Sequence, residues 1–86
     1  MWFVYILRCA DGTFYVGETC DLLQRLQQHN KGCASAHTAT RRPVRIAYAE
    51  EFADREAALA RERQLKRWSR AKEALIESDL VALKRL

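Results

Sequence analysis

The sequence lacks long apolar runs, repeats, linkers and low-complexity segments. No stretch approaches the roughly 20 apolar residues that a membrane-spanning helix needs, so no membrane association is expected. The first residues, MWFVYILRC, are too short and too weakly charged for a signal peptide and predict a strand instead. The cysteines number only three, an odd count that argues against a disulfide framework. These absences predict a cytoplasmic protein with reduced thiols.

The composition that is present is typical of one small globular domain. The chain has 86 residues, of which 49% are hydrophobic and 30% are charged. We therefore expect residues 1–86 to form a single domain with a thin core, because so short a chain buries only about 60% of its unfolded surface.

Positive charge is concentrated in the second half of the chain. Residues 1–40 carry three basic and three acidic side chains, whereas residues 41–86 carry twelve and eight. Within residues 61–72 there are six bases and one acid. Such a basic run is the usual footprint of phosphate binding, although a solvated helix face would look the same.

Strand and helix patterns follow one another, bounded by turn and cap residues. Asp11 and Gly12 indicate a hairpin turn, while Asp21, Asp54 and Ser69 suit the N-caps of three helices. The patterns predict strands at 2–9, 13–17 and 44–49, helices at 22–31, 55–68 and 70–86, and a loop at 33–42. The resulting order, β-β-α-β-α-α, indicates an α+β domain in which helices cover a small sheet.

Tyr5 and Tyr15 lie on the two strands of the predicted hairpin. A two-residue turn would pair Arg8 with Tyr15 and place the tyrosines on opposite faces. A three-residue loop would pair Tyr5 with Gly17, so that both tyrosines share a face, and Gly12 suits the left-handed position of such a loop. A shared site therefore predicts the longer loop, whereas two ordinary strand aromatics would not require it.

Arg25 and His29 are four residues apart, so they share a face of the first predicted helix. Leu22 and Leu26 form the neighbouring apolar stripe, which puts Arg25 at the edge of the buried face. A solvated arginine and a histidine favoured by the helix dipole are the plainer interpretation.

Glu62 interrupts the apolar stripe of the second predicted helix. It lies four residues after Ala58 and three before Leu65, so the helical period puts a carboxylate on or beside the buried face. A buried carboxylate needs a partner or a metal. Lys66, four residues on, offers a simple surface ion pair as the alternative.

Together these side chains suit metal-assisted phosphodiester hydrolysis. A carboxylate can hold Mg²⁺ with substrate phosphate, arginine binds phosphate, and tyrosine or histidine accepts a proton. The residues concerned are Tyr5, Tyr15, Arg25, His29 and Glu62. A zinc site is a weaker alternative, since the spacing of its four possible ligands matches no strong pattern: Cys20, His29, Cys33 and His37.

The joint spacing resembles the GIY-YIG nuclease superfamily, and more narrowly the small stand-alone bacterial members related to the nuclease subunit of nucleotide excision repair. The resemblance runs over nearly the whole chain. It rests on Phe3-Val4-Tyr5, Tyr15-Val16-Gly17, Arg25 with His29, and the stretch from Ala58 to Lys66, and is strengthened by residues 41–44 and 66–72.

The resemblance implies a three-stranded antiparallel sheet flanked by helices, the GIY-YIG fold. It implies that Tyr5 and Tyr15 are the motif tyrosines and that Arg25 stabilises the charge of the phosphate. It also implies that His29 orients the reacting groups or relays a proton. Glu62 would hold a single Mg²⁺ or Mn²⁺. Basic side chains expected to contact nucleic acid are Arg41, Arg42, Lys66, Arg67, Arg70 and Lys72.

Two positions depart from the pattern of relatives. Glu18 stands where the repair nuclease has a lysine, and Ala74 stands where many relatives carry an asparagine. The expected function is a metal-dependent DNA endonuclease of low sequence specificity in repair or recombination, acting on single-stranded or branched DNA. A protein partner would supply specificity, because so small a domain has little area for reading sequence. A binding module without activity is the alternative, and Glu62 discriminates between the two.

Overall fold

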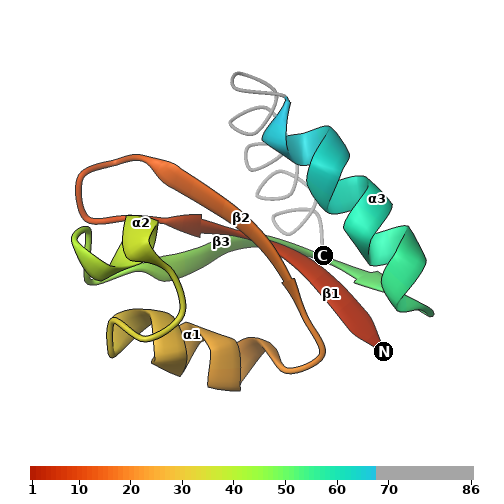
Figure 1. Cartoon of the computed structure of the whole chain (residues 1–86), viewed down its shortest axis with the longest axis horizontal. Coiled ribbons are helices and arrows are strands. Elements are labelled where there is room, and N and C mark those ends of the chain that lie inside the picture. The colour runs from red at the N-terminus through yellow and green to blue at the C-terminus, as the bar shows by residue number, and fades with distance from the viewer. Residues whose placement is uncertain (68–86) are drawn as a thin grey trace, which may run out of the picture.

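A computed structural model of the chain describes residues 1–67, and its centre is an antiparallel sheet of three strands (Figure 1). The strands are β1 (Trp2–Arg8), β2 (Phe14–Thr19) and β3 (Arg45–Phe52), in the order β2-β1-β3. β1 is rich in β-branched and aromatic residues, which suits the central position with neighbours on both sides. The predicted α+β class and the three-stranded antiparallel sheet are confirmed.

The hairpin between β1 and β2 has the three-residue loop that a shared tyrosine face requires. Cys9 N donates to Thr13 O at 2.8 Å, which closes the loop over residues 10–12. Gly12 has a φ of +86°, the left-handed conformation that glycine adopts at least cost. Tyr5 consequently pairs with Gly17, and both tyrosines lie on one face.

Two helices begin at the predicted caps. The side chain of Asp21 accepts from Gln24 N ahead of α1 (Leu22–Asn30), and that of Asp54 accepts from Ala57 N ahead of α3 (Arg55–Lys66). The last residue of the helix predicted at 55–68 and the whole helix predicted at 70–86 lie outside the described residues.

The predicted loop at 33–42 is wrong in part, because it contains the short helix α2 (Ala36–Ala39). Ser35 caps this single turn by accepting from the backbone N–H groups of His37 and Thr38. The small polar residues that suggested a loop are therefore those that begin a helical turn.

β3 is longer than the predicted strand at 44–49, and its alternation is broken. The register against β1 shifts between Ile6, which pairs with Tyr48, and Leu7, which pairs with Ile46. This bulge leaves Ala47 without a partner, so Tyr48 packs on the face opposite to Ile46. Simple alternation had placed Ile46 and Tyr48 together, and the bulge is the physical reason that it failed.

The sheet carries a core on each face, with α3 on one side and α1 on the other (Figure 1). The α3 side buries Val4, Ile6, Val16, Ala58 and Leu65. The α1 side buries Tyr5, Leu7, Cys9 and Val44, with Leu22 and Leu26 packed against them.

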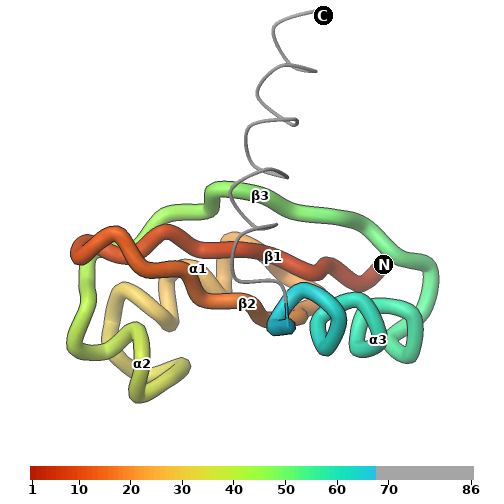
Figure 2. The backbone as a smooth tube through the Cα atoms, turned by 90° about the horizontal axis from the view of Figure 1, so that it is seen from above, coloured from red at the N-terminus to blue at the C-terminus, as the bar shows by residue number. Residues whose placement is uncertain are grey.

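The strands lie in the order β3, β1, β2 in the view of Figure 2, with α2 and α3 both beside β2. β2 is thus the edge strand that both α2 and α3 approach, with Tyr15 of β2 beside His37 of α2. In the described part of the chain, no helix has the length and apolar character required to span a bilayer.

Candidate active site

The phenol ring of Tyr5 lies across Gly17 of the neighbouring strand. A Cβ added at Gly17 would lie 2.6 Å from the ring carbon Cζ of Tyr5, closer than any real contact. Only glycine therefore leaves room for this ring, which explains why the second triplet ends in glycine. The arrangement brings the Tyr5 hydroxyl toward the β2 edge although the side chain is only 2% exposed.

A chain of hydrogen bonds runs from Tyr5 into α2. The Tyr5 hydroxyl lies 3.0 Å from His29 Nε2, and His29 Nδ1 lies 2.7 Å from Thr38 Oγ1. Because Thr38 Oγ1 donates to the Ser35 carbonyl at 3.3 Å, we infer that it accepts from the Nδ1–H of His29. His29 Nε2 is then unprotonated and accepts the phenol hydrogen of Tyr5.

Burial sets the protonation states of this pair. Burial, with the charge of Arg25 as a smaller cause, lowers the pKa of His29 below its ordinary value. Burial raises the pKa of Tyr5 well above its ordinary value, with smaller contributions from Tyr15, Glu62 and Glu18, while Arg25 opposes the rise. Near pH 7 the pair is therefore a neutral phenol that donates to a neutral imidazole.

Tyr15 and His37 complete an aromatic cluster around His29. The ring centroids of Tyr15 and His29 are 5.0 Å apart with their planes at 62°, an edge-to-face contact. The rings of Tyr15 and Tyr5 are 6.4 Å apart, and those of Tyr15 and His37 are 5.9 Å apart. The two tyrosines, which were predicted to share one face of the sheet, thus also have their rings in contact.

Arg25 and Glu62 approach from opposite helices. Arg25 is half-buried on α1, and the carboxylate of Glu62 on α3 is 15% exposed. Both charges influence the pKa of Tyr5, so both lie within electrostatic reach of the phenol. The five predicted site residues therefore come from four elements, β1, β2, α1 and α3, around the Tyr5 phenol.

Glu62 also forms the surface pair that was the alternative interpretation. Its Oε1 lies 2.8 Å from Lys66 Nζ, one helical turn further along α3. This hydrogen bond is the main cause that raises the pKa of Lys66. Glu62 Oε2 has no protein hydrogen bond among the described residues and is available for another ligand.

The donor set fits a magnesium ion that binds together with substrate. Residues 1–67 contain no group of three or more His, Cys, Asp or Glu side chains that could hold a metal by themselves. One carboxylate completed by water and substrate phosphate is a common arrangement for Mg²⁺, and Glu62 would supply that carboxylate. The four residues of the zinc alternative are not brought together, and both ring nitrogens of His29 are already hydrogen-bonded.

Two of the arginines predicted to contact nucleic acid hold the α2 segment in place. Arg41 pairs with Asp11 of the hairpin loop at 2.9 Å and donates to the His37 carbonyl at 2.8 Å. Arg42 donates to the carbonyls of Ala39 and Asn30, at 2.9 and 3.2 Å. Of the other predicted contacts, Lys66 pairs with Glu62, Arg67 is exposed at the end of α3, and Arg70 and Lys72 lie outside the described residues.

Thr38 and Ser35, next to the candidate site, were not predicted from the sequence, and His37 was predicted only as a possible zinc ligand. Thr38 is fully buried, and His37 lies beside Tyr15. Ser35 precedes Thr38 by three residues, which is the spacing between an N-cap side chain and the backbone N–H that it binds. This spacing is the signal that could have predicted the helical turn.

Glu18, the departure from the repair nuclease, faces away from the phenol cluster with Val16. Its Oε1 lies 3.6 Å from Arg55, and its Oε2 is buried with no hydrogen-bond partner among residues 1–67. The negative charge is therefore partly balanced from α3.

Comparisons with known proteins identify the family of this chain. A model of the GIY-YIG catalytic domain matches residues 1–74. The UPF0213 protein of Bacillus pumilus is 44% identical over 78 residues, which cover 91% of this chain and 80% of that protein. The UPF0213 protein of Halobacterium salinarum is 42% identical over 76 residues, 87% of this chain and 99% of that protein.

A solved structure is similar as well. The solution NMR structure of a UPF0213 protein from Bacillus halodurans has 36% sequence identity and a TM-score of 0.52. The match covers 98% of this chain and 86% of that chain. GIY-YIG nucleases act on nucleic acid and generally use divalent metals. The chain therefore belongs to the GIY-YIG nuclease superfamily, as the spacing of its tyrosines, arginine and glutamate predicted.

Proposed function

We propose that this protein is a Mg²⁺-dependent endonuclease that hydrolyses phosphodiester bonds in DNA. The observation that carries the proposal is the 3.0 Å hydrogen bond between the Tyr5 hydroxyl and His29 Nε2. A buried phenol beside a buried unprotonated imidazole is a route by which a proton leaves an attacking water. Structural packing alone would not require it.

In this proposal Tyr5 relays the proton and His29 is its acceptor. Because burial keeps the Tyr5 phenol protonated near pH 7, a free phenolate is not available as the base. As water attacks, its proton passes to the Tyr5 oxygen while the phenol proton moves to His29 Nε2. Thr38 holds the Nδ1–H of His29, so the imidazolium that forms keeps both of its hydrogens bonded.

Arg25, and Glu62 through a bound metal ion, would stabilise the negative charge of the phosphate. The guanidinium of Arg25 would stabilise the charge that grows on the scissile phosphate, because arginine suits phosphate oxygens. Glu62 would hold the metal ion, which when bound polarises the phosphoryl oxygens. Tyr15, packed edge-on against His29, would keep the imidazole oriented.

We further propose that the substrate is single-stranded or branched DNA, cut with little sequence specificity during repair or recombination. The described residues offer no long helix or ribbon free to enter a groove and read base edges. A protein partner would then supply specificity. Three free cysteines suit the reducing cytoplasm, where such a substrate is found.

The decisive experiment compares Glu62→Gln with Glu56→Gln. Both residues are on α3, but Glu56 is exposed in the first turn. Single-stranded, duplex and flapped DNA are incubated with Mg²⁺, Mn²⁺ or chelator after circular dichroism shows that all proteins are folded. We expect metal-dependent cutting by the wild type and Glu56→Gln, and none by Glu62→Gln.

The ion pair between Glu62 and Lys66 favours a second candidate, a nucleic-acid-binding module without activity. A pure binder needs Glu62 only as a partner for Lys66. If the wild type cuts no substrate with either metal but binds DNA, this second candidate replaces the first.

A further inference from the structure

Two arginines face each other at one end of the sheet. Arg8 ends β1 and Arg45 begins β3, and their Cα atoms are direct partners in the antiparallel ladder. Like charges in this position destabilise a sheet. The bulge at Ala47 creates the juxtaposition, since an unbroken register would place Ile46 opposite Arg8. Bulges commonly re-aim side chains near functional sites.

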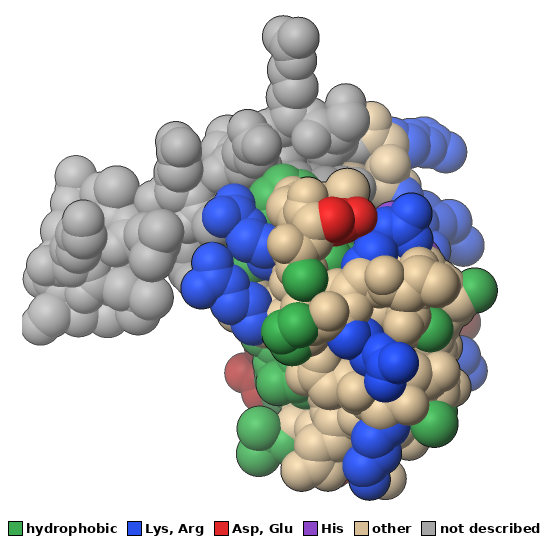
Figure 3. Space-filling model, turned by 90° about the vertical axis from the view of Figure 1, so that its left-hand side faces the viewer, with side chains coloured by type: hydrophobic (Ala, Val, Ile, Leu, Met, Phe, Trp, Pro, Cys, Tyr) green, Lys and Arg blue, Asp and Glu red, His purple; other side chains and the backbone are tan. Residues whose placement is uncertain are grey.

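Neither guanidinium is neutralised by a carboxylate in residues 1–67. Arg41, Arg55 and Arg61 each form an ion pair, whereas Arg8 instead lies over the Phe14 ring at 5.1 Å. Figure 3 views the end of the molecule that carries the hairpin loop and α2, and Lys and Arg side chains are spread over it while acidic ones are few.

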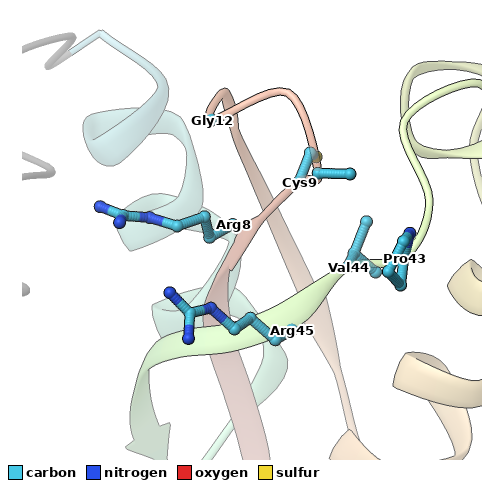
Figure 4. Close-up of a pocket in the computed structure, with 7 residues that line it drawn as sticks. Arg8, Cys9, Gly12, Pro43, Val44 and Arg45 are labelled. Carbon is cyan, nitrogen blue, oxygen red and sulfur yellow. The ribbon is translucent and has the colours of Figure 1, made fainter.

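The two arginines border a surface pocket of about 360 Å³. In Figure 4 both side chains extend in the same direction and away from Cys9, Pro43 and Val44. The two guanidinium groups therefore reach the same region of the surface, on the face of the sheet opposite to the buried Cys9 and Val44. Two cationic groups that extend together suit an anionic phosphate.

We propose that Arg8 and Arg45 together bind a backbone phosphate of the nucleic acid strand. The proposal rests on the proposed function and adds a second contact for the same substrate. Arg8 is three residues along β1 from Tyr5, about 10 Å along the strand, and lies on the face that α3 covers. A few nucleotides span that distance, because phosphates follow one another at about 3.4 Å of rise along a strand. The bound phosphate also removes the repulsion between the two guanidinium groups.

The test is a charge reversal with a matched control. Arg45→Glu is compared with Lys31→Glu, since both residues are exposed and both changes alter the net charge equally. Binding of a fluorescent single-stranded oligonucleotide is measured by anisotropy over a range of NaCl concentrations, with chelator present to prevent cutting. Arg45→Glu creates an opposite-charge pair with Arg8, so its urea midpoint should not fall.

We expect the Kd of Arg45→Glu to rise by roughly tenfold or more and its salt slope to fall by about 1. Lys31→Glu should change the Kd much less and leave the slope unchanged. Equal effects of the two variants would overturn the proposal. Because binding is measured without cutting, loss of binding in Arg45→Glu would support the phosphate site even if the wild type proves to have no nuclease activity.

Discussion

Both faces of the sheet carry a buried core, but the two cores differ in polarity. On β1, Val4 and Ile6 face α3, while Tyr5 and Leu7 face α1, and all four are nearly or fully buried. The α3 side has an apolar core, whereas the α1 side includes the hydrogen-bonded chain from Tyr5 to Thr38.

We expect the apolar core on the α3 face to contribute mainly to stability, and the hydrogen-bonded chain on the α1 face to contribute mainly to the reaction. A buried polar group costs free energy unless it is hydrogen-bonded, and an apolar core of the same shape would be as stable or more so. The α3 face demonstrates that this short chain can build such a core. The proposed reaction would account for the polar chain on the α1 face, which folding alone does not require.

The largest expected effect is on turnover, from Tyr5→Phe. The variant keeps the ring and removes the hydroxyl that would relay the proton. We expect the single-turnover cleavage rate to fall by about 10²–10⁴-fold, the usual contribution of general acid–base catalysis. Urea unfolding should show a loss of only about 1–3 kcal/mol, because His29 Nε2 loses its donor. Unchanged cleavage would remove Tyr5 from the mechanism.

For Ile6→Ala, one residue further along β1, we expect a large loss of stability and little change in the cleavage rate. Ile6 is fully buried on the α3 face, so the lost packing and the cavity should cost about 2–5 kcal/mol of unfolding free energy. Cleavage per folded molecule should remain at the wild-type level when measured well below the unfolding transition. A large loss of rate with little loss of stability would contradict the division between the two faces.

A smaller effect is expected for Thr38→Val, which keeps the shape but removes the acceptor for His29 Nδ1–H. The imidazole is then free to move its hydrogen to Nε2, and we expect cleavage to fall by about tenfold. NMR of the ring nitrogens should show the altered tautomer. Thr38→Ser should restore both, whereas a purely structural role for Thr38 would leave the tautomer unchanged in every variant.

The pH dependence follows from the lowered pKa of His29. The unfolded chain takes up a proton near the ordinary value of about 6.5, before the folded protein does, so stability falls as pH drops below that value. Cleavage should fall in the same direction, with its acid limb below pH 6.5, because His29 must be neutral to accept a proton. His29→Gln should flatten the stability profile between pH 7 and 5; an unaltered profile would contradict the assignment.

The sequence predicted the features that local chemistry determines. Gly12 suited the three-residue loop that a shared site required, and Asp21 and Asp54 marked the helix starts. The helical period put Glu62 beside the buried face, where it lies. The roles given to these residues remain proposals.

Long-range contacts explain what the sequence could not predict. α2 is a single turn, held by hydrogen bonds that Arg41 and Arg42 make to residues elsewhere in the chain. The bulge in β3 depends on pairing with β1, so neither the position of Tyr48 nor the meeting of Arg8 with Arg45 follows from alternation. The composition of a segment does not reveal such partners.

The smallest expected effect decides between the two interpretations of Glu62. If Glu62 holds the metal, Lys66 competes for its carboxylate, and Lys66→Gln should lower the Mg²⁺ concentration for half-maximal cleavage. A helix pair of this kind contributes about 0.2–0.5 kcal/mol, so the expected shift is only about twofold. Arg67→Gln, which removes the same charge from the neighbouring exposed position, is the control at saturating DNA. A shift shared by both variants would reflect general charge, and a shift confined to Lys66→Gln would assign the carboxylate to the metal, because only Lys66 touches it.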